Sequence, residues 1–463
     1  MNSTINIIIL GSGFAAIEAL KKLQKHYKNN NNIDIKIISK DNFILFTPML
    51  PEVFSGKIEP RHIITPVRAF CNKKSKFYQG NVKDINFEKR IVTVNYAIGR
   101  YYQPLSYKQK EFKFDYLVIA LGNETNFFGN INIEKNCFTM KTINDAFVLR
   151  NHIINILEQV NLEHFTYRTD LIKQLLTFVV VGGGFSGIET VGELSHFVKD
   201  TIKSYYKNIN PNDVKIVLVD GGDSILTEID EDLGEYAKNR LEKKEEIEFK
   251  MNKMAKGATQ NKLMLNNGED ISTYTIIWTA GVTPNKLVKR LDCEHDKKGN
   301  IKTNNTLELS NFSNIYAIGD CASTINPFKG NPYPPTAQHA IKQGQSAAKN
   351  IINNIEGKSL KEIRYKTRGT MATIGNRDGV AKVLGFKYKG LIAWSLWRSF
   401  YLSKLPTLKK KLRVIGDWSI GLVFYSDISM IKGYIEENYD NDLKENDNNN
   451  KSEINFDNTK IKA

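Results

Sequence analysis

Two glycine-rich segments of the same design dominate the sequence, and each follows an apolar run that reads as a β-strand. The first is Ile-Ile-Ile-Leu-Gly11-Ser-Gly13-Phe14-Ala-Ala16, and the second is Val-Val-Val-Gly182-Gly-Gly184-Phe-Ser-Gly187. In such a segment the first glycine permits a tight turn, the second lets the backbone approach a pyrophosphate, and the third small residue packs helix on strand. The helix that follows offers N–H groups and a positive dipole end to the phosphates. Two copies predict two dinucleotides held face to face, as hydride transfer between a nicotinamide and a flavin requires.

Strands and helices alternate on both sides of the second glycine segment. A helix over 15–27 and a strand over 33–39 follow the first segment, a strand is expected over 112–120, and a helix over 188–199 follows the second segment. This alternation predicts an α/β fold with two Rossmann-like dinucleotide-binding domains built on parallel sheets. The apolar run over 311–318 reads as a strand that returns to the first sheet. The second nucleotide domain is therefore predicted to be inserted into the first.

Residues near the ends of particular strands assign a nucleotide to each unit. Asp220 ends the strand after the second glycine helix, where a carboxylate accepts a hydrogen bond from a ribose 2′-OH and repels a 2′-phosphate. We therefore expect NADH, rather than NADPH, in the second unit. In the first unit Ser39 and Lys40 stand where an acidic residue is usual, and Ser39 can still hydrogen-bond a ribose. Asp320, in Ala-Ile-Gly-Asp, is expected to hold the ribityl chain of a flavin, and its alternative role is a helix N-cap in a plain turn.

Two further strands end in small residues. These segments are Ala120-Leu-Gly122, which is expected beside the flavin, and Ala280-Gly281, which is expected beside NADH. Small side chains there would permit backbone contact with the cofactors, and ordinary strand-to-loop punctuation is the alternative explanation. Hydride transfer depends on holding nicotinamide and flavin about 3–3.5 Å apart, more than on an acid or a base.

A basic and aromatic segment from Leu391 to Trp418 gives a meaning to the formal net charge of +15. At 100° per residue, one stripe of a helix is formed by Trp394, Trp397, Tyr401 and Leu405. Tryptophan and tyrosine favour the headgroup level of a bilayer, and neighbouring lysines are attracted to anionic lipid. The segment is therefore predicted to attach the chain to an anionic membrane surface without crossing it. A packing helix or a dimer interface is the alternative.

Several partners and locations are not expected. No apolar run is long enough for a transmembrane helix. The basic cluster lacks a nucleic-acid-binding motif, so no nucleic acid partner is expected. The four cysteines show neither CxxC nor the spacing of metal ligands, so no metal site is predicted. The first strand begins near the first residue, which predicts no signal or transit peptide. The expected location is the cytoplasmic face of the cell membrane.

The chain resembles a type II NADH dehydrogenase, the single-subunit, non-pumping NADH:quinone oxidoreductase. Besides the glycine segments, the motifs that carry the resemblance are Phe46-Thr-Pro-Met-Leu-Pro-Glu52, Glu59-Pro-Arg-His62, Gly319-Asp320-Cys-Ala322 and Pro335-Thr-Ala337-Gln338-His-Ala340. The resemblance extends from the first strand to about residue 432 and departs from the family pattern at Ser39. It implies non-covalent FAD, NADH as the substrate, a membrane quinone as the electron acceptor, and peripheral attachment to a respiratory membrane.

The resemblance also implies two catalytic residues. It places Glu189 close to the nicotinamide, where the carboxylate supports hydride transfer or couples it to quinone binding. The alternative is a carboxylate in the first helical turn that complements the helix dipole. Ala337 and Gln338 open a helix after two prolines, with its N-terminus facing the flavin and Gln338 hydrogen-bonding a quinone carbonyl. A buried polar cap at a domain junction is the alternative for Gln338.

These features predict an FAD-binding domain in two parts, an inserted NADH-binding domain and a C-terminal amphipathic region. The expected limits are 1–125 for the first FAD part, 140–298 for the NADH domain, 299–365 for the second FAD part with the quinone-site helix, 366–435 for the membrane-association region, and 436–463 for a polar, disordered tail. A sulfide:quinone reductase and a soluble NAD(P)H flavoprotein reductase with a protein acceptor stay open as alternatives. A flavin-binding, NADH-sensing interaction protein and a homodimer also stay open.

Overall fold

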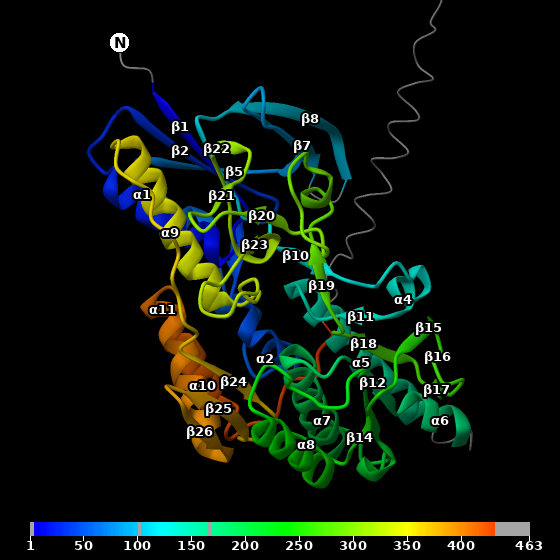
Figure 1. Ribbon diagram of the computed structural model, residues 1–463. Coiled ribbons are helices and arrows are strands. Elements are labelled where there is room, and N and C mark those ends of the chain that lie inside the picture. The colour runs from blue at the N-terminus through cyan, green and yellow to red at the C-terminus, as the bar shows by residue number, and fades with distance from the viewer. Residues whose placement is uncertain (1–3, 101–102, 164–168, 431–463) are drawn as a thin grey trace, which may run out of the picture.

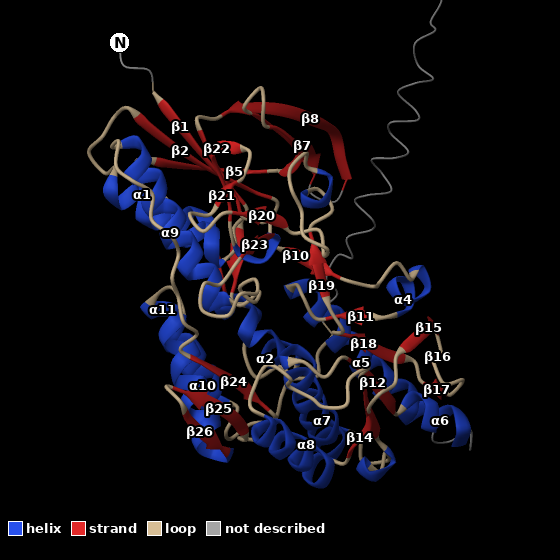
Figure 2. Ribbon diagram, viewed as in Figure 1, coloured by secondary structure: helices blue, strands red, loops and turns tan. Residues whose placement is uncertain are grey.

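The computed structural model describes residues 4–100, 103–163 and 169–430. The tail expected over 436–463 lies outside these residues. Figure 1 shows the first sheet at the top, a second sheet at the lower right, and the C-terminal helices at the lower left. Figure 2 shows helices covering the sheets, as an α/β fold requires.

The first sheet has the strand order β23-β20-β21-β22-β9-β1-β2-β5. Its strands are β1 (Ile5–Leu10), β2 (Ile33–Ser39), β5 (Ser75–Gln79), β9 (Tyr116–Ile119), β20 (Ile301–Thr303), β21 (Glu308–Leu309), β22 (Phe312–Ala317) and β23 (Ala322–Thr324). The run β22-β9-β1-β2-β5 is parallel. Four consecutive apolar residues of β1, from Ile7 to Leu10, are fully buried, because parallel strands are covered on both faces.

The second sheet is also parallel and has the order β11-β18-β12-β13-β14. Its strands are β11 (Phe138–Thr139), β12 (Thr177–Val181), β13 (Lys215–Val219), β14 (Ile247–Lys250) and β18 (Thr275–Trp278). In both sheets the strand before the glycine turn, β1 or β12, lies between its two parallel neighbours. This placement puts each glycine turn at a change of strand order, where α/β sheets bind their ligands.

All strands of the second sheet fall between β9 and β20 in the chain, which is the arrangement expected for an inserted unit. The two crossings pair with each other as antiparallel strands, β10 (Asn123–Thr125) and β19 (Val282–Pro284). The expected return of the chain through β22 to the first sheet is confirmed, because β22 pairs with β9. The exact domain limits stay a prediction.

The remaining strands form small sheets at the periphery. They are β3 (Phe43–Leu45) with β4 (Ile64–Pro66), β6 (Asn81–Asn86) with β7 (Ile91–Arg100) and β8 (Gln103–Lys113), β15 (Ala255–Thr259) with β16 (Lys262–Leu265) and β17 (Asp270–Ser272), and β24 (Gly369–Thr373) with β25 (Gly379–Val383) and β26 (Phe386–Lys389). The α-helices are α1 (Phe14–His26), α2 (Leu50–Phe54), α3 (Pro60–Ile63), α4 (Ile131–Asn136), α5 (Ile143–Glu163), α6 (Thr169–Leu175), α7 (Phe185–Tyr205), α8 (Glu231–Glu245), α9 (Ala337–Ile355), α10 (Gly390–Lys404) and α11 (Leu408–Ile420).

Two expected elements differ from the structure. The strand expected over 112–120 is two strands, because Phe112 belongs to β8, antiparallel to β7, while β9 begins at Tyr116 in the parallel sheet. The break is fixed at Asp115, whose carboxylate accepts a hydrogen bond from the backbone of Asn6 at 2.7 Å. The helix expected over 188–199 is longer, and α7 starts directly after Gly184.

The C-terminal helix pair has the expected stop and start. Helix α10 ends before Leu405 and Pro406, and the side chain of Thr407 caps α11 by accepting a hydrogen bond from the backbone N–H of Lys410. The interpretation of the aromatic stripe was wrong. Trp397 and Leu405 are buried against the second-sheet core and Tyr401 packs on it, so the stripe faces the protein and not a membrane. Helical periodicity identifies a face, but it does not say what covers that face.

Candidate nucleotide sites and the buried acids beside them

Close packing allows only glycine at position 11, in the first glycine turn. Gly11 has φ +104°, and a Cβ built there would lie 2.2 Å from the carbonyl oxygen of Ala120. Ala16 is fully buried where α1 packs on the sheet. The structure therefore brings together Gly11, Ala120 and Ala16, as the sequence pattern predicts for a tight strand-turn-helix unit.

Gly13 has a different role from Gly11. It is the N-cap of α1, with φ −75°, and a Cβ built there would have no described residue within 4 Å other than its neighbours in the chain. Backbone strain therefore does not require glycine at this position. The space beside Gly13 and the N–H groups at the start of α1 fit a pyrophosphate, which a larger side chain would displace.

The second glycine turn repeats this geometry. Gly182 has φ +114°, and its Cβ would lie 2.8 Å from the backbone of Ala280. A Cβ at Gly187 would lie 1.8 Å from the carbonyl oxygen of Gly182, so only glycine allows α7 to pack this closely. Gly184 caps α7 with φ −75° and has open space beside it, like Gly13. In both units, the open space beside the N-cap glycine fits the pyrophosphate of a dinucleotide.

The strand-end residues support these turns differently in the two units. The carboxylate of Asp220 accepts hydrogen bonds from the backbone N–H groups of Gly183 at 2.6 Å and Gly222 at 2.7 Å. Ser39 is buried, and its hydroxyl donates to the hydroxyl of Ser12 inside the first glycine turn at 2.9 Å. Ser39 thus holds its turn as Asp220 holds the other, but without a charge. Lys40, the next residue, is exposed.

Asp320 lies in the short 3-10 helix η6 (Gly319–Cys321), between α1 and α9. Gly319 has φ +74°, and its N–H donates to the side chain of Gln343 at 2.6 Å. Burial raises the pKa of the Asp320 carboxyl, and Lys141 opposes this shift by its charge. Gly122, with φ +68°, has open space where a Cβ would stand. A flavin chain with hydroxyl groups fits such a buried carboxylate better than a second anion would.

Helix α9 begins at Ala337, after Thr336 as its N-cap. The two prolines precede this cap, so the helix opens after them at Ala337, as expected. The Gln338 side chain bridges to the first residue of β24 and to the segment before it. Its amide donates to the carbonyl of Gly369 at 3.2 Å and its oxygen accepts from the hydroxyl of Tyr365 at 3.2 Å. Gln338 therefore connects the start of α9 to the C-terminal region.

Glu189 faces the C-terminal region from α7. It is the fifth helical residue, on the second turn and not the first, so a helix-dipole role is disfavoured. Its carboxylate accepts hydrogen bonds from the indole N–H of Trp397 at 3.0 Å and from the backbone N–H of Thr373 at 3.4 Å. Burial raises the pKa of Glu189 to about 8, and these two hydrogen bonds only partly offset it. With this pKa the carboxyl of Glu189 is mostly protonated at neutral pH.

Aromatic rings connect the first glycine helix to Glu189. The ring of Phe14 meets that of Phe46 edge-on with centroids 5.6 Å apart, and Phe46 meets Tyr401 at 6.0 Å. Tyr401 in turn lies 4.7 Å from Trp397, the residue that donates to Glu189. Phe14 therefore belongs to a continuous aromatic contact from the first unit to α10, and the hydrogen bond from Trp397 to Glu189 extends this contact to the second unit.

Sequence reasoning missed the buried charges around Glu189. Glu52 on α2 and Glu193 on α7 are both buried, and they face Arg398 and Lys57. Lys57 lies 2.9 Å from Glu193, and Arg398 lies 3.1 Å from Glu52. One signal was available, because Glu52 is a lone acid inside the apolar run Pro-Met-Leu-Pro-Glu-Val-Phe. Its partner, more than 300 residues away, had no local signal.

Comparison with known proteins agrees with this geometry. Residues 5–344 match the family model described as pyridine nucleotide-disulphide oxidoreductase, and residues 367–425 match the NDH2 C-terminal domain. A probable NADH dehydrogenase of Dictyostelium discoideum is 32% identical over 426 residues, which is 91% of this chain and 90% of that protein. The type II NADH:quinone oxidoreductase Ndh of Mycobacterium tuberculosis is 28% identical, covering 89% of this chain and 87% of its own.

A solved structure shares the fold. NDH2 from Plasmodium falciparum in complex with NADH superposes with a TM-score of 0.81 at 21% identity, covering 93% of this chain and 100% of that chain. Family models cover both the nucleotide units and the C-terminal region, and the predicted fold class is confirmed. The chain belongs to the pyridine nucleotide-disulphide oxidoreductase family, and within it to the type II NADH dehydrogenases.

Proposed function

We propose that this chain oxidises NADH and passes the electrons to a membrane quinone, with non-covalent FAD as the intermediate carrier. The observation that carries the proposal is the pair of equivalent open helix starts at Gly13 and Gly184, each on its own parallel sheet. The name of the M. tuberculosis relative, a type II NADH:quinone oxidoreductase, supports the same activity. The proposal includes no proton pumping.

FAD is assigned to the first unit and NADH to the second. The residues proposed to hold FAD are Gly11, Gly13, Phe14, Ala16, Ser39, Lys40, Ala120, Gly122, Asp320, Ala337 and Gln338. Those proposed to hold NADH are Gly182, Gly184, Gly187, Glu189, Asp220, Ala280 and Gly281. When bound, a flavin accepts a hydride and gives up two electrons. Around it, the α9 N-terminus would favour negative charge, and Glu189 would hold a proton at the nicotinamide side.

Replacing Asp220 with alanine should relax the preference for NADH over NADPH. The variant loses the carboxylate that would repel a 2′-phosphate and hydrogen-bond a 2′-OH. We expect the ratio of the kcat/KM values for the two donors to fall by about tenfold. Steady-state rates with each donor measure this ratio. Asp223→Ala, three residues on and exposed, is the matched control, and an unchanged ratio in Asp220→Ala would place the selectivity elsewhere.

Gln338→Ala should impair electron transfer to quinone more than reduction by NADH. The side chain joins α9 to the start of β24 and to the segment before it, on the side proposed for the quinone. We expect kcat/KM for quinone to fall about tenfold, the effect of losing one or two hydrogen bonds, with flavin reduction by NADH changed less than about twofold. Stopped-flow absorbance separates the two half-reactions. Gln345→Ala on the same helix is the control, and an equal loss in both half-reactions would contradict the assignment.

We also propose that the C-terminal helices rest on an anionic membrane, with the protein on its cytoplasmic face. No helix in the described part of the chain is long and apolar enough to cross a bilayer. Exposed apolar side chains instead gather on the outer side of α10 and α11, namely Leu391, Ile392, Leu408, Leu412 and Ile420. Lys409 and Arg413 lie among them and are exposed. A patch of exposed apolar and basic side chains favours binding to a membrane surface. Each basic residue near an anionic surface contributes about 1 kcal/mol to the free energy of binding.

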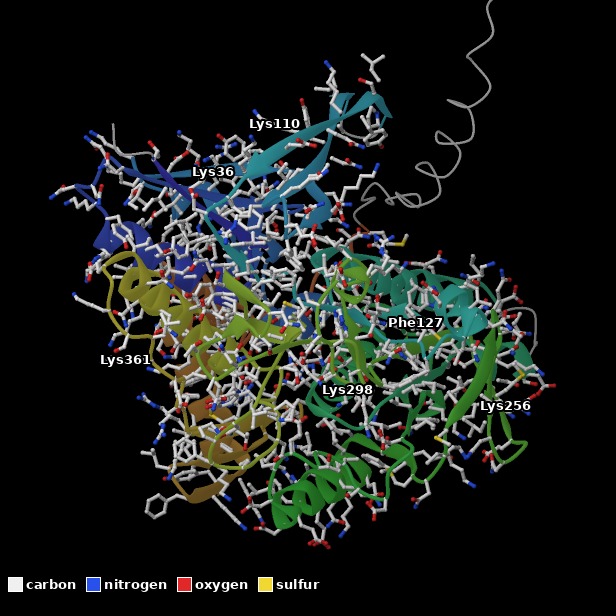
Figure 3. The ribbon with its side chains drawn as sticks, turned by 45° about the horizontal axis from the view of Figure 1, so that its top comes forward. Lys36, Lys110, Phe127, Lys256, Lys298 and Lys361 are labelled. Atoms are coloured by element: carbon white, nitrogen blue, oxygen red, sulfur yellow. The ribbon has the colours of Figure 1, made fainter. Side chains whose placement is uncertain are left out.

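The positive charge is not confined to these helices. Figure 3 labels Lys36 on β2 and Lys110 on β8 in the first unit, and Lys256 on β15 far from them in the second unit. The net charge of +15 therefore does not by itself identify a membrane face, and the proposal depends on apolar and basic side chains occurring together.

One assay tests the proposed function. The purified, FAD-loaded protein should oxidise NADH with a quinone in anionic vesicles and sediment with those vesicles. A sulfide:quinone reductase would instead oxidise sulfide, and a soluble reductase would need a protein acceptor. The thiols do not favour the sulfide reaction, because burial raises the pKa of Cys137 to about 12 and of Cys321 to about 11. A protein that binds both nucleotides without quinone turnover would be a sensor and would contradict the proposal.

A further inference from the structure

An ion pair between α2 and α10 is almost excluded from water. The guanidinium of Arg398 donates to the Glu52 carboxylate at 3.1 Å, and the two side chains are 16% and 5% exposed. Burying two charges costs free energy that only good geometry repays. A buried ion pair therefore need not stabilise the fold. Its position, between α2 and α10, indicates a role in holding these two helices in place.

Two indole rings hold the Arg398 guanidinium between them. The guanidinium carbon lies 4.1 Å from the centroid of the Trp394 ring on α10 and 4.3 Å from that of Trp418 on α11. Trp418 also donates its indole N–H to the second oxygen of Glu52 at 3.2 Å. Both carboxylate oxygens of Glu52 are therefore used to hold the two C-terminal helices, and the planar guanidinium is required for the stacking.

The same turn of α10 reaches Glu189. Trp397, adjacent to Arg398, donates to the Glu189 carboxylate at 3.0 Å. Adjacent helical residues point about 100° apart, so the two contacts fix both the rotation of α10 and its height above α7. The backbones of Gly192 on α7 and of Gly375, in the turn between β24 and β25, are in close contact. This contact fixes the distance between α7 and the C-terminal region.

We propose that Arg398, held by Glu52 and the two indoles, is a positioning residue that sets the Trp397–Glu189 hydrogen bond and thereby electron transfer to quinone. This inference rests on the proposed function, because it acts through Glu189. It assigns a role to α10 that differs from membrane contact. The apolar residues on its outer side meet the lipid, while Arg398 and Trp397 on its inner side orient the site.

Three variants distinguish positioning from simple stabilisation. Arg398→Met should lower kcat/KM for quinone by about 10- to 100-fold, the cost of a misplaced site. Arg398→Lys keeps the charge without the planar stack, and it should fold normally yet lose several-fold. Glu52→Gln/Arg398→Met removes both buried charges, so it should recover thermal stability without recovering kcat/KM. Recovery of both in the double variant would overturn the inference.

The decisive experiment combines these changes with Glu189→Gln in the FAD-loaded enzyme. If Arg398 acts through Glu189, Arg398→Met should cause less than about a twofold further loss in the Glu189→Gln background. Full additivity of the two losses would overturn this inference alone, while wild-type quinone turnover in Glu189→Gln would overturn it together with the proposed role of Glu189. The control is Arg240→Met, which removes the ion pair between α8 and Asp378, beside the start of α10, and should change kcat/KM less than about twofold.

Discussion

A valine at Gly13 should yield a folded protein that has lost its flavin, and a valine at Gly184 should yield a flavoprotein that NADH no longer reduces. Both glycines adopt an extended conformation that any residue can adopt, with open space where a Cβ would stand. The apoprotein therefore tolerates either change, and the penalty arises only from overlap with a pyrophosphate. We expect each affinity to fall by at least about 100-fold, or about 3 kcal/mol.

The two variants control for each other. Visible absorbance after gel filtration measures flavin retention, and anaerobic addition of NADH measures reduction. Gly416→Val on α11, another glycine with open space around it, should behave as wild type in both measurements. If Gly184→Val lost the flavin and Gly13→Val kept it, the assignment of the two nucleotides would be reversed.

Glu189→Gln should remove a pH dependence of stability. The carboxyl has a pKa of about 8 in the folded protein, because of burial, against an ordinary value of 4.5. Between these values the folded state holds a proton that the unfolded state releases, so the free energy of unfolding falls as pH rises from about 5 to about 8. The full shift corresponds to about 5 kcal/mol, and we expect about 2 kcal/mol, because Glu189 as a whole residue is only half-buried and nearby solvent weakens the effect of burial.

Denaturant unfolding of the FAD-loaded protein at pH 5.5, 7 and 8.5 measures this difference. The glutamine variant should match the wild type at the low pH and exceed it at the high pH, since it never carries the buried charge. Glu134→Gln, on an exposed turn of α4, should keep the wild-type pH profile. Parallel pH profiles for wild type and Glu189→Gln would show that Glu189 is ionised throughout.

The sequence predicts those features whose cause is local. A glycine turn requires Gly11 because of its own φ and a neighbouring strand, and Thr407 caps α11 through a residue three positions on. The parallel sheets follow from buried apolar runs that alternate with helices. These signals lie within a few residues of the feature that they predict, so pattern reading finds them.

Features that depend on distant partners were missed or misread. The stripe of Trp397 and Leu405 was identified as a face, yet its cover is the second-sheet core and the helix α7 rather than lipid. Glu52 meets Arg398 across most of the chain, so no spacing rule connects them. The strand break at Asp115 depends on a hydrogen bond to the backbone of Asn6. Each of these is decided by tertiary contacts, which override local propensity.

A single anaerobic titration, followed by visible absorbance, tests most directly whether electrons pass from NADH through the flavin to quinone. The purified protein is made anaerobic, NADH is added in slight excess, and a membrane quinone in anionic vesicles follows, while absorbance near the flavin maximum is monitored. We predict a yellow protein that bleaches with NADH and regains its colour with quinone. A colourless protein, or a bleached one that quinone does not restore, would contradict the account.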